Sequence, residues 1–230
     1  MYVGFDIGSV ALKVVVLDEE GCVVETHYIR THGQPLEHAH KMLSDLLERY
    51  EISVLAATGY GGKRFAEILD IPFTNEIVAH ATAVGFLHPD ARTVIEIGGE
   101  DSKLIKIETD QESGHVRIRD IRMNTLCAAG TGSFLDQQAA RLGVSIEEFG
   151  KMALKCEHPP RIAGRCSVFA KTDMIHLQQQ ATPVEAIVAG LCFAMVRNYV
   201  SSIAKRGDFE EPIVFVGGVA ANAGIRRAFE

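Results

Sequence analysis

The sequence predicts an α/β protein of two lobes, in which mixed sheets are flanked by helices. Short apolar runs that end in glycine, such as residues 2–8 and 93–99, are typical of buried strands followed by tight turns. Strands prevail in the first half of the chain, whereas helical periodicity prevails from Gly132 onward. Repeated strand, glycine turn and helix indicate helices layered on sheets. We expect a first lobe over residues 1–90 and a second over residues 91–230.

In the first lobe, the chain opens with strands and then changes period. The apolar run 2–8 ends in glycine, and residues 12–21 enter an acidic turn, so both predict strands, with a third at 22–30. Between residues 35 and 50, apolar residues recur at helical spacing and predict an amphipathic helix. Residues 52–62 read as a strand followed by a glycine-rich turn, and residues 76–88 as a helix.

In the second lobe, residues 93–108 predict a strand, a turn and a second strand, and residues 114–123 a further strand. Helices are then expected at 133–142, 145–154, 167–179 and 183–204. Residues 212–230 predict a strand, a glycine turn and the start of a helix. No cap residue, glycine or proline ends that last helix, which is the pattern expected of an excised domain.

Composition and charge exclude several classes of protein. The net charge of −7 and the pI near 5.7 argue against binding to nucleic acid or to an anionic membrane surface. The five cysteines are odd in number and include no CxxC pair, which fits a reducing cytosol. Asp6 and Lys13 interrupt any signal peptide, and the apolar segment 184–196 carries Glu185 and is too short to span a bilayer. A cytoplasmic location is therefore expected.

Two hairpins repeat one pattern. "VGFDIGSVALK" and "VIEIGGEDSK" both run apolar residue, acid, Ile and Gly, and each has a lysine seven residues after the acid. Two such turns facing one another would hold a polyphosphate, and their acids could hold Mg²⁺ through its waters. The alternative is two unrelated hairpins with solvated acids. The candidates are Asp6, Glu96 and Asp101 for magnesium and water positioning, and Gly8, Ser9, Lys13, Gly98, Gly99, Glu100 and Lys103 for phosphate.

A third glycine turn, Gly217-Gly218-Val219, lies between a buried strand and a helix. Adjacent glycines let a flat ring approach the backbone, so an adenine or ribose contact is one interpretation and a plain strand–helix turn the other. Asn222 either supports this adenosine loop or caps the last helix. Walker and dinucleotide motifs fail, because Ala57, Arg64 and Leu135 occupy required positions.

A small-residue loop, Gly130-Thr131-Gly132, directly follows Cys127. Such a loop suits the approach of a phosphate, to which a thiol adds nothing. Taken alone, Cys127 and Cys166 are more often apolar filler than ligands, since free cysteine is among the most buried residue types.

These motifs resemble the ATPase activators of 2-hydroxyacyl-CoA dehydratases, a family that includes the ATPase subunits of benzoyl-CoA reductases, within the actin, sugar-kinase and heat-shock-chaperone ATPase superfamily. The similar blocks are "DIGS…K" at 6–13, "ATGYGG" at 57–62, "IGGEDSK" at 97–103, "MNTLCAAGTGSFLDQQA" at 123–139, "RCSVFAKTDM" at 165–174 and "GGVAANAG" at 217–224. The resemblance implies an actin-like (ribonuclease H-like) ATPase fold with the nucleotide in the cleft between lobes. It is closest to the N-terminal ATPase unit of long fused activators.

The resemblance also implies the chemistry. In the family, cysteines matching Cys127 and Cys166 bind a 4Fe–4S cluster shared across a homodimer. ATP and Mg²⁺ then drive an electron from a ferredoxin or flavodoxin to an acyl-CoA dehydratase or reductase. Val10 and Ala11 replace hydroxyl residues common in the first loop. Glu96 and Glu100 stand in the second, which often begins with Asp and contains Gln, and the added carboxylate is one reason to expect slow hydrolysis. The other interpretations are a small-molecule (sugar or acid) kinase and a non-catalytic nucleotide sensor.

Overall fold

The computed structural model describes residues 1–124, 128–163, 166–204 and 208–230. The chain divides into two compact units, Met1–Ala83 and Val84–Glu230, which are described separately below. The dividing point falls within helix α3 (Glu76–Leu87). The roles assigned to each lobe by the sequence stay predictions.

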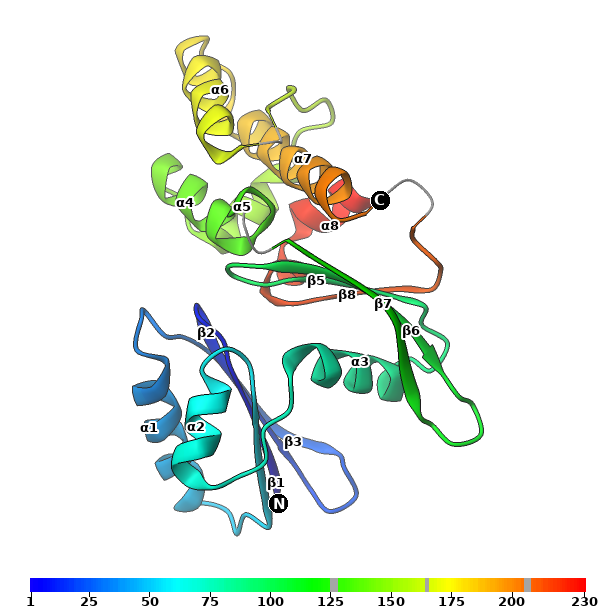
Figure 1. Ribbon diagram of the computed structural model, residues 1–230. Coiled ribbons are helices and arrows are strands. Elements are labelled where there is room, and N and C mark those ends of the chain that lie inside the picture. Colours follow the sequence, from blue (N-terminus) through cyan, green and yellow to red (C-terminus); the bar gives the residue numbers. More distant parts are fainter. Residues whose placement is uncertain (125–127, 164–165, 205–207) are drawn as a thin grey trace. The chain divides into compact units, whose positions relative to one another are not determined.

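Unit 1 is built on a four-stranded sheet in the order β3-β2-β1-β4. Strands β1 (Tyr2–Ile7), β2 (Ala11–Leu17) and β3 (Val23–Arg30) are antiparallel neighbours, and β4 (Val54–Thr58) runs parallel to β1. Helix α1 (Pro35–Leu47) buries Ala39, Leu43 and Leu46, which lie three or four residues apart on one face. Their packing on β1 and β2 forms the core of this unit (Figure 1).

Helix α2 (Gly62–Leu69) was not predicted, and only its first residue falls in the glycine-rich turn expected at the end of residues 52–62. The helix starts at Gly62, and glycines usually mark turns rather than helix starts. Phe65 and Ala66 of this helix are nevertheless buried, in the same core as the apolar residues of β1 and β4. Tertiary burial thus outweighs the local turn signal.

Unit 2 repeats the sheet order as β7-β6-β5-β8. Its strands are β5 (Thr93–Ile97), β6 (Ser102–Thr109), β7 (Val116–Asn124) and β8 (Ile213–Val216). The helices are α4 (Gly132–Leu142), α5 (Ile146–Ala153), α6 (Ser167–Gln179), α7 (Val184–Ser202) and α8 (Ala223–Phe229), with short 3-10 turns at Ala128–Gly130 and Gly218–Ala221. Helices α4 to α8 gather on one side of this sheet in Figure 1.

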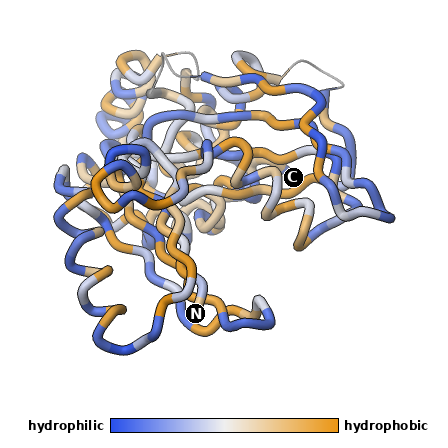
Figure 2. Tube along the Cα trace, turned by 60° about the horizontal axis from the view of Figure 1, so that its bottom comes forward, coloured by the Kyte–Doolittle hydropathy of each residue, from blue (hydrophilic) through white to orange (hydrophobic). Residues whose placement is uncertain are grey.

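Helix α7 supplies much of the core of unit 2. Among the described residues it is the one helix long and apolar enough to cross a membrane, and it extends beyond the segment 184–196 judged too short from sequence. Its side chains from Ile187 to Tyr199 are largely buried against α5, α8 and the sheet. Figure 2, coloured by hydropathy, shows hydrophobic stretches of the chain interrupted by hydrophilic ones. Burial within the protein accounts for the composition of α7.

The predicted internal repeat is confirmed in the strand pairing. Asp6 lies opposite Lys13 in the β1–β2 hairpin, and Glu96 lies opposite Lys103 in the β5–β6 hairpin. Both hairpins are antiparallel, and both first strands pair in parallel with a later strand of the same unit. The two units therefore share one strand topology, as expected for mixed α/β layers.

Candidate functional site

The first hairpin turn, in unit 1, holds its acid and lysine together. Lys13 Nζ lies 3.0 Å from Asp6 Oδ2, and both side chains are partly exposed. The Gly8 amide donates to Ala11 O at 3.1 Å and closes the turn. Ser9 lies at the turn and its carbonyl accepts from Thr31 Oγ1 at 3.3 Å. The predicted residues of the first loop are thus gathered in one turn.

Gly59, after β4, closes on the same turn. Its φ is +86°, and a Cβ there would lie 2.5 Å from Asp6 Oδ1 and 2.8 Å from Ile7 O. A side chain is therefore excluded on both conformational and steric grounds. The sequence pointed to this glycine only as part of "ATGYGG", without its contact to Asp6.

The second hairpin turn, in unit 2, differs because its lysine is buried. Lys103 is 1% exposed and its Nζ donates to Glu96 Oε2 at 2.8 Å and Asp101 Oδ2 at 2.7 Å. Burial alone would lower the pKa of Lys103, but the charges and hydrogen bonds of the two carboxylates outweigh it and raise that pKa. The ammonium therefore stays charged and ties both candidate acids to one point, while Glu100 is exposed.

The glycine loop at residues 130–132, which follows Cys127 in the sequence, packs on the second hairpin turn. The amides of Gly132 and Ser133 donate to Gly98 O and Gly99 O, each at 2.8 Å. A Cβ on Gly132 would lie 3.0 Å from Gly98 O and 3.2 Å from Val219 Cγ2. The motifs at 98–101 and 130–133, which are separate in the sequence, are thus hydrogen-bonded to each other in the fold. The glycine turn at 217–219 lies beside them through Val219.

In the third glycine turn, Gly217 lies as close to a neighbouring strand as Gly59 does in unit 1. Gly217 has a φ of +91°, and a Cβ there would lie 2.4 Å from Ile97 O. Asn222 Oδ1 accepts from the Ile225 amide at 3.1 Å, so this side chain caps α8. Adenosine contacts by Gly217, Gly218 and Val219 stay a prediction, as does a second role for Asn222.

Cys166 lies at the start of α6, whereas Cys127 is outside the described residues. Cys166 is half-buried and lines a cavity of about 730 Å³. Arg161 and Arg197 also line this cavity, and neither makes an ion pair with any described residue. Burial, and then the charge of Arg161, lower the pKa of Arg197. The N-terminus of a 13-residue helix and the charges of these two arginines make this cavity favourable for a negatively charged group.

The remaining described cysteines have other surroundings. Cys192 lies in the core of unit 2, where burial raises its pKa to about 12. Cys156 is half-buried, and Cys22 lies on an exposed turn just before β3 rather than within the strand. Within the described ranges, no three His, Cys, Asp or Glu side chains gather as a metal site, so a cluster site would need thiols beyond these.

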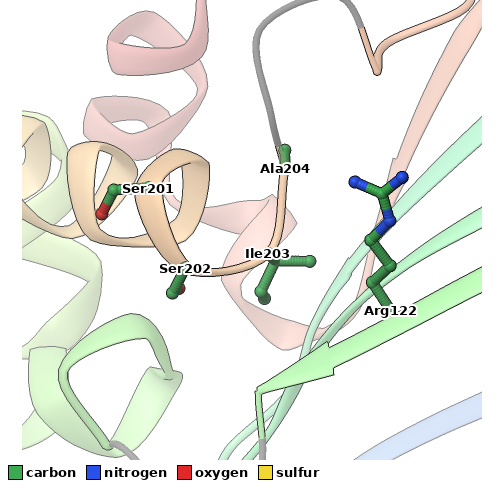
Figure 3. A pocket seen from close by; sticks show the side chains of 5 residues that line it. All are labelled: Arg122, Ser201, Ser202, Ile203 and Ala204. Atoms are coloured by element: carbon green, nitrogen blue, oxygen red, sulfur yellow. The ribbon is translucent and has the colours of Figure 1, made fainter.

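A second cavity, of about 350 Å³, was not expected from the sequence (Figure 3). Arg122 and residues 201–204 line it. Arg122 is paired with Asp208 and with Asp120, and the Ser201 and Ser202 hydroxyls both donate to Asn198 O. Since these groups are already bonded within the protein, we assign this cavity no ligand.

Known proteins resemble the whole chain. The (R)-2-hydroxyglutaryl-CoA dehydratase component A of Acidaminococcus fermentans has a similar structure (TM-score 0.88, 30% identity, covering 100% of this chain and 87% of that one). The activator of 2-hydroxyisocaproyl-CoA dehydratase from Clostridium difficile, solved with bound ADPNP, gives a TM-score of 0.84 at 35% identity over 99% of this chain and 83% of that one. These likenesses confirm the predicted family resemblance.

The fold is shared more widely. A ROK-family glucokinase from Streptomyces griseus has a TM-score of 0.53 at 14% identity over 99% of this chain and 88% of that one, which shows a common fold alone. Together with the two activator structures, this likeness confirms the predicted actin-like ATPase fold. The family model described as "BadF/BadG/BcrA/BcrD ATPase family" matches residues 3–230. The chain belongs to the BadF/BadG/BcrA/BcrD ATPase family.

Proposed function

We propose that this chain hydrolyses ATP to drive a low-potential electron into a 2-hydroxyacyl-CoA dehydratase or related acyl-CoA reductase. The electron would come from a ferredoxin or flavodoxin and pass through a 4Fe–4S cluster shared by two copies of the chain. The observation that carries the proposal is the position of Cys166 at a helix start, in a cavity also lined by two arginines that make no ion pair with any described residue, in a chain similar to dehydratase activators.

The nucleotide part of the proposal rests on the two hairpin turns and the glycine turn at 217–219. Asp101 is partly exposed, so it is the acid of the second turn that a magnesium-bound or attacking water can reach. Glu96 is nearly buried and instead keeps Lys103 in place. Asp6 occupies the position of Glu96 in the first turn but is partly exposed, so it would contact the metal's waters from unit 1.

The cluster part rests on Cys127 and Cys166. When bound, the cluster supplies a one-electron redox centre, and a cubane of this type takes four thiolates. Two cysteines from each of two copies, related by a two-fold axis, complete that set. Val168 and Phe169, directly after Cys166, are 65% and 64% exposed, and a second copy would cover such apolar side chains.

The proposal predicts iron that depends on these two thiols. The full-length protein, purified without oxygen, is expected to hold about two irons and two sulfides per chain, equal to one cubane per dimer. Cys166→Ser and Cys127→Ser should lose the iron and the brown colour, whereas Cys22→Ser, at an exposed turn, should keep both. Iron, sulfide and visible absorbance check this.

Two results would count against the proposal. If both cysteine variants retain their iron, Cys127 and Cys166 are not the ligands of the cluster. An iron-free protein that releases ADP only when a sugar is added would instead support the kinase interpretation.

A further inference from the structure

Helix α7 has polar side chains in one turn that donate hydrogen bonds to two other segments of unit 2. Tyr199 Oη donates to Lys103 O at 2.8 Å, and Tyr199 is fully buried. Arg197 Nη2 donates to Ile162 O at 2.7 Å. Asn198 Oδ1 lies 2.9 Å from where a Cβ on Gly130 would be. An otherwise apolar core helix thus carries its polar contacts at one place.

The Tyr199 contact leads to the second hairpin turn. The side chain of Lys103 binds Glu96 and Asp101, and its carbonyl accepts from Tyr199. Because this lysine and tyrosine are buried, a hydrogen bond that breaks when the turn moves is not replaced by one to water. A displacement of the turn acids is therefore opposed unless α7 moves with them.

The Arg197 contact leads to α6. Next to Ile162, the Ala163 amide donates to Asp173 Oδ2 at 2.7 Å, and Asp173 belongs to α6, whose first residue follows Cys166. Arg197, Ile162, Ala163, Asp173 and Cys166 all line the same cavity. The two branches begin at Tyr199 and Arg197, which are two residues apart on α7 and so lie within a single helical turn.

We propose that α7 couples the nucleotide state of the second hairpin turn to the start of α6 at Cys166, with Tyr199 and Arg197 as the positioning residues. This inference rests on the proposed function and names the route within it. The route runs through described contacts alone and differs from a direct effect of the Gly130–Gly132 loop on Cys127.

Hydrogen exchange tests the proposal without measuring activity. In the full-length wild-type protein, binding of ADPNP is expected to change amide exchange in peptides covering residues 166–179. Tyr199→Phe keeps the ring in the core and removes only the hydroxyl that Lys103 O accepts from. It should still bind ADPNP, while the change in exchange falls about fivefold. Tyr28→Phe, which removes an exposed hydroxyl in unit 1, should behave as the wild type.

Arg197→Gln provides a second variant with little risk to folding, because Arg197 is exposed. It should reduce the same change in exchange, whereas Arg227→Gln should not. Arg227 is a matched control, since it also donates from a helix to backbone carbonyls, those of Ala153 and Cys156.

The two proposals fail in different ways. Absence of iron, or of ADPNP binding, in the wild-type protein would overturn the proposed function. If the wild type holds iron and binds ADPNP, the coupling route is overturned by an unchanged α6. It is equally overturned by a change in α6 that persists undiminished in both Tyr199→Phe and Arg197→Gln.

Discussion

Lys13 and Lys103 occupy the same position in the two hairpins but differ in burial. The Lys13–Asp6 pair has side chains 38% and 30% exposed, whereas Lys103 is 1% exposed between two acids. Ion pairs open to solvent contribute little to stability, but removal of one partner of a buried pair leaves an uncompensated charge. The repeat therefore provides two matched sites with different energetics.

Lys103→Met is expected to lower the free energy of unfolding by about 3–5 kcal/mol. Lys13→Met should lower it by about 0–1 kcal/mol. Urea unfolding of the two variants measures both costs. Equal costs would show that the burial of Lys103 does not govern its contribution.

Gly217 provides a second prediction at the residue scale. Gly217→Ala combines a φ of +91° with a Cβ 2.4 Å from a backbone oxygen, whereas Gly21→Ala has a φ of +82° in open space. We expect Gly21→Ala to cost about 1 kcal/mol of stability, and Gly217→Ala clearly more, because the backbone of β5 cannot give way. Thermal unfolding checks the order, and similar melting temperatures would contradict it.

At the scale of elements, glycines and apolar runs predicted most of the fold. Each run that ended in glycine, such as residues 2–8 and 93–99, became a strand and a turn. Helix α2 was missed because its start at Gly61-Gly62 reads locally as a turn. The contact of Gly217 with Ile97 could not be predicted, since it depends on β8 pairing with a strand far away in the sequence.

Only part of the geometry of the candidate site could be predicted, because the rest also depends on contacts that form only in the folded chain. Spacing placed each acid opposite its lysine, because a tight hairpin fixes the register. Spacing carried no signal that Lys103 is buried or that Arg161 and Arg197 lie near Cys166. Arg197, for example, comes from α7, which meets the start of α6 only in the folded unit.

The contact between β3 and the segment that follows α1 gives a prediction on pH. The hydrogen bond from Arg49, followed by that from Tyr50, lowers the pKa of Glu25 from 4.5 to about 2. Because the folded pKa is the lower one, this contact stabilises the fold fully above about pH 4.5, and the stabilisation is lost as the pH falls toward 2. Glu25→Gln should flatten the dependence of the melting temperature on pH in this window. An unchanged slope would show that other carboxylates control it.

At the scale of the whole molecule, the two predicted phosphate loops belong to different compact units, with Asp6 in one and Asp101 in the other. If both loops contact the same nucleotide, its binding requires both units to be folded. Binding then stabilises both units against unfolding. At a concentration of about 100 Kd, ADPNP is expected to add about 2.7 kcal/mol of stability. Limited proteolysis with mass spectrometry should then show slower cleavage in residues 1–83 as well as in residues 84–230. Digestion of residues 1–83 at the same rate with and without ADPNP would mean that the first hairpin does not contact the nucleotide. Its resemblance to the second would then be one of fold alone.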